Sequence, residues 1–99
     1  MINHVVLFKL KEFAAEEKQA ILNELKAMLE GLKESIPELK YIEVGLNYEL
    51  DAKSHDLALI SHFETIAGLD VYRVHPEHLK VVKRMGEVAE TRAAVDFEF

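Results

Sequence analysis

The stretch INHVVLFKL, residues 2–10, decides the fold because it is a β-strand pattern with apolar side chains on both faces. Successive side chains of a strand point to opposite faces. One face carries Ile2, His4, Val6, Phe8 and Leu10, and the other carries Asn3, Val5, Leu7 and Lys9. A strand that is apolar on both sides is covered on both sides. We therefore expect a covering layer on each face of the sheet that contains this strand.

The segments that follow alternate between helical and strand patterns. Apolar residues at three- and four-residue spacing predict a long helix over residues 14–37. Alternating apolar and polar residues predict strands over 38–50 and 57–63, joined as a hairpin by a polar turn over 51–56. Gly45 lies inside the first of these strands, where an isolated glycine indicates a bulge.

The last third of the chain predicts two short helices and a final strand. Thr65 is a suitable N-cap for a helix that ends near Tyr72. A second helix begins with His75 as its N-cap and Pro76 as its first residue, a position that proline favours. Its expected buried stripe consists of Leu79, Val82, Met85 and Ala89. Residues 92–99 alternate again and predict the closing strand.

The predicted order of elements is β-α-β-β-α-α-β, which is a split βαβ pattern with its second helix divided in two. This order predicts one α+β domain over residues 1–99, with a ferredoxin-like four-stranded antiparallel sheet and helices on one face. The apolar side chains on the other sheet face would be left in water in a single copy. We therefore expect a homodimer in which two sheets pair face to face as a dimeric α+β barrel.

Composition excludes several classes of function. The chain has 18 acidic and 12 basic residues and a net charge of −6, which disfavours nucleic acid and anionic membranes as partners. It has no cysteine, which excludes disulfides, zinc–thiolate sites, iron–sulfur clusters and a cysteine nucleophile. No signal peptide or membrane-spanning stretch is apparent, so we expect a cytoplasmic protein.

The motif YRVHPEH, residues 72–78, gathers the side chains best suited to chemistry. His75 and His78 are three residues apart at a helix start, so their rings can share a face. Two histidines can contribute to a metal site, but no third or fourth ligand stands at a fixed spacing, and we expect no metal and no other cofactor. Tyr72 and His78 facing one cavity would form a general acid–base pair. Alternatively, Tyr72 packs in the core and the histidines only cap the helix.

His4 lies on the central strand in a row with Val6 and Phe8, so we expect it to be buried. Two interpretations stay open for its imidazole. It is either a core histidine that is hydrogen-bonded to a neighbour, or a polar group that lines a pocket between the sheet and the helices.

Five stretches of the chain resemble the stress-responsive A/B barrel (Dabb) family. They are HVVLFKLK, IPELKYIEVGLN, ALISHFET, YRVHPEHLKV and AVDFEF. The resemblance implies a dimeric α+β barrel, in agreement with the fold expected from the residue pattern. Most members of this family have no assigned reaction.

A few plant members of the family are polyketide cyclases, which catalyse an intramolecular aldol condensation. Their acting tyrosine and histidine fall here on Tyr72 and His78, and their early strand histidine falls on His4. In that role His78 is the base, Tyr72 donates a hydrogen bond to the enolate oxygen, and His4 lines the pocket. The cyclase type carries one more histidine at the start of the third strand, where this chain has Leu57.

Three functions follow as expectations. The first is a small homodimeric protein whose cavity holds an apolar or aromatic small molecule, with His4 and His75 as ligand-binding candidates. The second is a cofactor-free enzyme of the cyclase type that uses Tyr72 and His78. The third is a purely structural dimer, in which side chains fill the space beside Tyr72 and His78.

Overall fold

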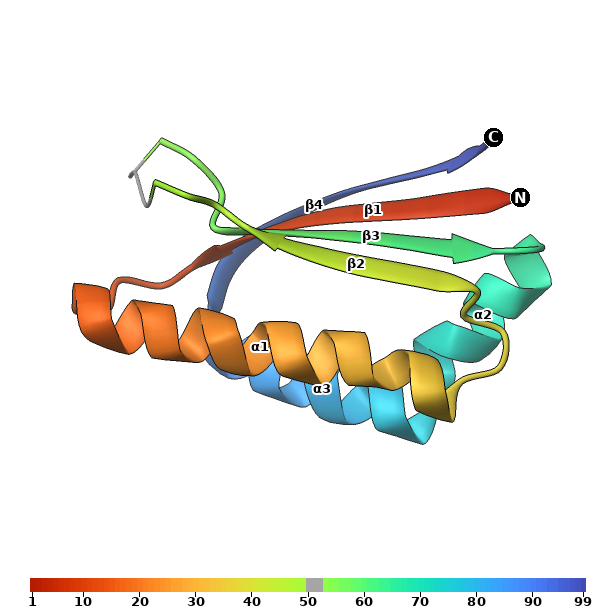
Figure 1. Ribbon diagram of the computed structural model, residues 1–99, viewed down its shortest axis with the longest axis horizontal. Helices are drawn as coiled ribbons and strands as arrows, with labels where there is room; N and C mark the ends of the chain where they lie inside the picture. Colours follow the sequence, from red (N-terminus) through yellow and green to blue (C-terminus); the bar gives the residue numbers. More distant parts are fainter. Residues whose placement is uncertain (50–52) are drawn as a thin grey trace.

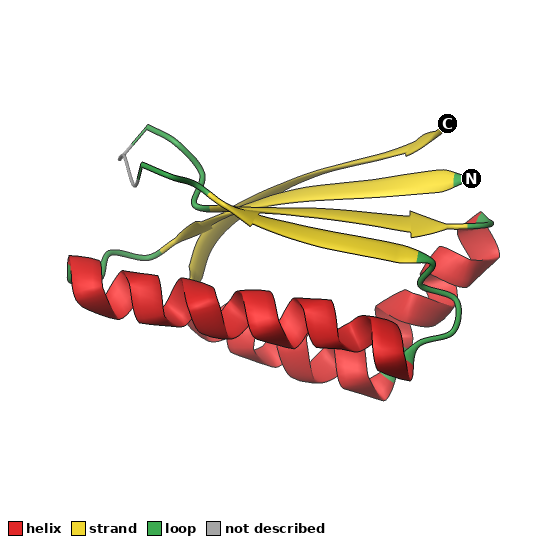
Figure 2. Ribbon diagram, viewed as in Figure 1, coloured by secondary structure: helices red, strands yellow, loops and turns green. Residues whose placement is uncertain are grey.

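The computed structural model describes residues 1–49 and 53–99 as a four-stranded antiparallel sheet with three helices on one of its faces (Figures 1 and 2). The elements are β1 (Ile2–Leu10), α1 (Ala15–Ser35), β2 (Tyr41–Leu46), β3 (Leu57–Phe63), α2 (Ile66–Val74), α3 (Pro76–Val88) and β4 (Ala89–Glu98). This is the ferredoxin-like fold expected from the order of elements. The predicted turn over 51–56 falls partly outside the described residues.

The strands are ordered β2-β3-β1-β4, so β1 is central as expected. The register between β1 and its neighbours places His4 opposite Ser61 on β3 and opposite Asp96 on β4. The bulge expected at Gly45 is absent, because Gly45 pairs with Ala58 in an unbroken ladder. The ladder shifts its register instead at the end of β1, between Lys9 and Leu10 where β1 pairs with β4.

The core lies between the inner face of the sheet and helix α1. Leu22, Leu25 and Leu29 of α1 are buried against it. Each fully buried leucine contributes roughly 1.5–3 kcal/mol to folding. Asp56, just before β3, is completely buried. Its Oδ2 accepts a hydrogen bond from the Leu10 backbone N–H at 2.8 Å, so this carboxylate ties the start of β3 to the end of β1.

The buried stripe of α3 differs from the one predicted. Leu79 and Val82 are each 49% exposed, and the helix instead buries Val81, Met85 and Val88. Both stripes repeat at helical spacing and both contain Met85, so the sequence period alone leaves the rotation of the helix open. The rotation is set by packing of α3 beside α1 (Figure 1).

The sheet face away from the helices carries exposed apolar side chains, as expected from β1. Leu7, Val95, Phe97 and Phe99 are all more than a third exposed. His62 joins them, with its ring 4.6 Å from the ring of Phe99. Monomeric proteins rarely leave so continuous an apolar face in water.

Candidate functional site

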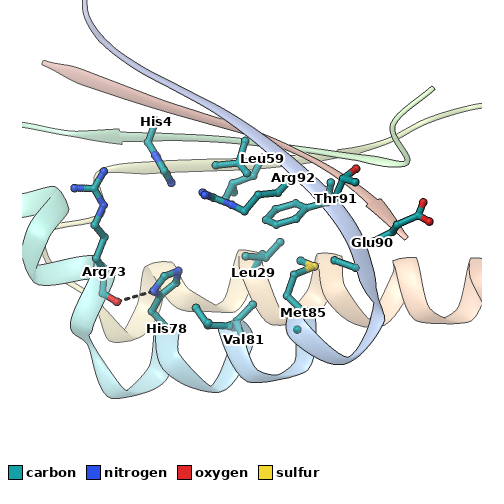
Figure 3. Close-up of a pocket in the computed structure, with 15 residues that line it drawn as sticks. His4, Leu29, Leu59, Arg73, His78, Val81, Met85, Glu90, Thr91 and Arg92 are labelled. Carbon is teal, nitrogen blue, oxygen red and sulfur yellow. Dashed lines mark hydrogen bonds between the residues drawn. The ribbon is translucent and has the colours of Figure 1, made fainter. Parts of the chain in front are cut away.

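A cavity of about 460 Å³ lies between the inner face of the sheet and helix α3 (Figure 3). Its walls are mostly apolar, and its polar groups come from β1, α2, α3 and β4. The apolar lining residues are Val6, Phe8, Leu29, Leu59, Val81, Val82, Met85 and Ala89; Gly86 also lines it, and the polar ones are His4, Arg73, His78, Glu90, Thr91 and Arg92. Small-molecule sites combine an apolar wall with a few converging polar groups, and their volumes are roughly 300–1,000 Å³.

His4 points from the central strand into this cavity (Figure 3). It is buried, and its Nδ1 lies 2.5 Å from Oδ1 of Asp96. A carboxylate only accepts, so Nδ1 carries the hydrogen and the Nε2 atom is left for the cavity. The other oxygen of Asp96 accepts a hydrogen bond from Arg73 Nη2 at 2.9 Å, and Arg73 also binds Asp70 at 2.9 Å. These linked hydrogen bonds of His4, Asp96, Arg73 and Asp70 fix the orientation of the His4 imidazole.

His78 reaches the cavity from the first turn of α3. Its Nδ1 lies 3.1 Å from the backbone carbonyl of Arg73, which can only accept, so Nδ1 donates and Nε2 carries the free lone pair of the neutral ring (Figure 3). Burial lowers the pKa of His78 below its ordinary 6.5. The hydrogen bond to Arg73 works against this shift, whereas electrostatic interactions with His4, Arg92 and His75 add to it. The ring is therefore neutral at pH 7 and able to accept a proton.

Tyr72 and His78 lie together, with ring centroids 4.2 Å apart. Tyr72 is completely buried and also packs against Phe63 at 5.0 Å. Within the described part of the chain its hydroxyl has no hydrogen-bond partner, and burial raises the pKa of Tyr72 to about 12. The phenol therefore stays protonated near pH 7 and would act as the hydrogen-bond donor toward an anion. Tyr72 is not among the residues that line the cavity.

His75 occupies the N-cap of α3, as expected. Its Nδ1 accepts a hydrogen bond from the backbone N–H of Glu77 at 3.1 Å. It does not line the cavity, so a contact with a ligand stays a prediction for His75. Among residues 1–49 and 53–99, no three side chains of the types His, Cys, Asp and Glu are grouped as they would be around a metal ion.

Three charged residues of the site were not predicted from the sequence. Asp96 is the partner of His4. Arg73 holds Asp96, and Arg92 lines the cavity on β4. The pairing of β1 with β4 is the feature that could have identified Asp96. An antiparallel register that sets His4 opposite Asp96 also puts both side chains on one sheet face.

Comparison with known proteins agrees with the fold and the motif. The stress responsive A/B barrel domain model matches residues 2–99. The chain belongs to the stress-responsive A/B barrel domain family. This membership confirms the resemblance seen in the Y-x-x-H-P-x-H motif and in the first strand. None of the helices in the described ranges is long and apolar enough to cross a membrane.

Relatives of this A/B barrel domain occur in plants and bacteria. The chain is 26% identical over 102 residues to the stress-response A/B barrel domain-containing protein DABB1 of Arabidopsis thaliana. It matches along 98% of its own length but spans only 46% of that relative. It is 30% identical to the uncharacterized protein SCO4036 of Streptomyces coelicolor, over the whole of both chains.

A solved structure from Bacteroides fragilis is similar over nearly the whole A/B barrel domain. It is a dimeric protein of unknown function with a ferredoxin-like fold. Its sequence is 38% identical, its TM-score is 0.90, and the match covers 99% of this chain and 95% of the other.

Proposed function

We propose that this A/B barrel domain binds an apolar or aromatic small molecule in the cavity between the sheet and α3. The observation that carries this proposal is the cavity itself, in which apolar walls surround two inward-facing imidazoles, His4 and His78. An apolar recess of this volume with a few converging polar groups is the usual form of a small-molecule site. The fixed orientation of both imidazoles suits the recognition of a polar group on an otherwise apolar ligand.

The active form that we propose is a homodimer joined through the outer sheet faces. The exposed apolar side chains of that face support it, and the similar structure from Bacteroides fragilis is described as dimeric. A twofold axis would bury the same patch from both copies. Each copy would keep its own cavity, because the cavity lies on the helix side of the sheet.

Two glycines provide a matched test of binding. Gly86 lines the cavity on α3, and a Cβ built there meets no atom within 4 Å, so Gly86→Leu inserts a side chain into the empty space. Gly31 on α1 is equally open but lies outside the cavity, so Gly31→Leu is the control. Both changes also raise the helix propensity by a similar amount.

The probe is a neutral aromatic molecule, 1-naphthamide, titrated while amide chemical shifts are recorded. We expect saturable shifts around His78 and Met85 in the wild type and in Gly31→Leu, and none in Gly86→Leu. Shifts that are equal in all three proteins, or spread over the surface, contradict a binding site in this cavity.

A second candidate is proton-transfer catalysis of the aldol type, and the hydrogen bonding of His78 favours it. Nε2 of His78 would remove a proton from a C–H group between two carbonyls, and the resulting enolate carbon would attack a ketone of the same molecule. The proton then returns from His78 to the new alkoxide. Tyr72 would donate a hydrogen bond to the enolate oxygen, which requires its hydroxyl to reach the cavity.

Linear poly-β-keto thioesters test this candidate. Catalysis predicts cyclised products above the buffer background, with losses in both His78→Ala and Tyr72→Phe. Product patterns that match buffer alone, or unchanged activity in both variants, remove the catalytic candidate and leave the binding function standing.

A further inference from the structure

Arg92 is unlike the other two arginines of this chain. Arg73 binds the carboxylates of Asp70 and Asp96, and Arg84 binds those of Glu24 and Glu87. The guanidinium of Arg92 forms no ion pair or hydrogen bond with any residue in the ranges 1–49 and 53–99. In a chain with six more acidic than basic residues, a guanidinium without a carboxylate partner is a noteworthy exception.

The position of Arg92 is fixed by the sheet. Arg92 pairs with Phe8 across β1 and β4, so its side chain lies on the face toward the helices. The guanidinium extends over the cavity toward the side where His4 lies, with His78 on the opposite wall (Figure 3). The positive charge of Arg92 also contributes to the lowered pKa of His78.

Neither Asp96 nor Glu90 provides a carboxylate partner for Arg92. Asp96 is held by His4 and Arg73. Glu90 lines the mouth of the cavity, but its carboxylate points away from the guanidinium (Figure 3). The cavity therefore presents one uncompensated positive charge beside an apolar wall.

We propose that the ligand of this cavity is a monoanionic carboxylate with an apolar or aromatic body, and that Arg92 binds its carboxylate. A guanidinium matches a carboxylate by two parallel N–H···O bonds, which gives both affinity and orientation. A single guanidinium without a carboxylate partner at the cavity, in a protein of net charge −6, suits a single negative charge better than a dianion such as a phosphate monoester. The apolar body would lie against Leu29, Val81 and Met85. This inference rests on the proposed binding function.

The test compares 1-naphthoate with its neutral counterpart 1-naphthamide by calorimetry and by chemical-shift titration. A hydrogen bond to a charged group predicts that the wild type binds the carboxylate roughly ten- to a hundredfold more tightly. Arg92→Gln should abolish this preference while keeping the affinity for the amide, and Arg92→Lys should retain part of it. Lys83→Gln removes the same charge from an exposed site on α3 outside the cavity, so it should behave as the wild type.

A second readout is the titration of His78 in the bound protein. A carboxylate held beside Arg92 favours the protonated imidazole, so 1-naphthoate should raise the pKa of His78 and 1-naphthamide should not. Equal binding of the two probes, or a preference that survives in Arg92→Gln, overturns the inference about Arg92 and leaves the binding function intact. If neither probe binds at the cavity, both proposals fail together.

Discussion

The orientation of His4 should depend on the charge of Asp96, and Asp96→Asn tests this without changing the shape of the side chain. The change replaces a charge-assisted hydrogen bond, worth roughly 1.5–3 kcal/mol, by a neutral one worth about 1 kcal/mol. It also removes the Arg73–Asp96 ion pair, which is partly exposed and contributes roughly 0.2–1 kcal/mol. We therefore expect the free energy of unfolding to fall by about 1–3 kcal/mol.

Asp70→Asn is the matched control, because it removes the same charge and a second partner of Arg73. The Asp70 side chain is 62% exposed, so its loss should cost no more than about 0.5 kcal/mol. Urea unfolding gives both free energies. Imidazole ¹⁵N shifts report the tautomer of His4, which should move away from the Nδ1–H form only in Asp96→Asn. Equal stability of the two variants together with an unchanged His4 tautomer would refute the proposed role of Asp96.

Three further predictions concern stability and assembly. The pKa of His78 is lowered in the folded state, so its neutral form stabilises the fold above pH 6.5, and that contribution is lost as the pH falls below 6.5. The loss of stability with falling pH, followed by circular dichroism, should therefore be less steep in His78→Asn than in the wild type. An identical pH profile in the two proteins would contradict this. Asp56→Ala leaves the Leu10 N–H unsatisfied and should lower the free energy of unfolding in urea by roughly 1–3 kcal/mol, whereas a loss near zero would mean that water replaces the carboxylate. Val95→Glu places a charge on the exposed apolar sheet face and should convert a dimer to a monomer by light scattering at micromolar concentration; a monomeric wild type would refute the dimer itself.

Much of the fold can be predicted from the sequence because the strand and helix patterns along the chain agree with the topology of the folded sheet. The ferredoxin-like order of elements predicts that the first strand is central, and the structure places β1 between β3 and β4. His75 and Pro76 together predict a helix start, and the structure begins α3 there. The first signal is the order of patterns along the chain and the second lies within two adjacent residues, so neither requires the contacts between distant side chains.

The features that the sequence did not reveal depend on contacts between distant segments. The phase of α3 is decided by packing against α1, so Leu79 lies half in solvent although it fits a helical stripe. Asp96 becomes the partner of His4 only through the register of β1 and β4, 92 residues apart in the chain. The burial of Tyr72 outside the cavity lining likewise depends on how α2 meets the sheet, which residue spacing does not encode.

The central claim is that the space beside His78 and His4 receives a small molecule. A crystal structure of the dimer grown with 1-naphthoate tests it most directly. We expect density within the cavity, with the carboxylate against Arg92 and the rings against Met85. Density confined to the protein surface, or a cavity closed by side chains of the protein itself, would contradict it.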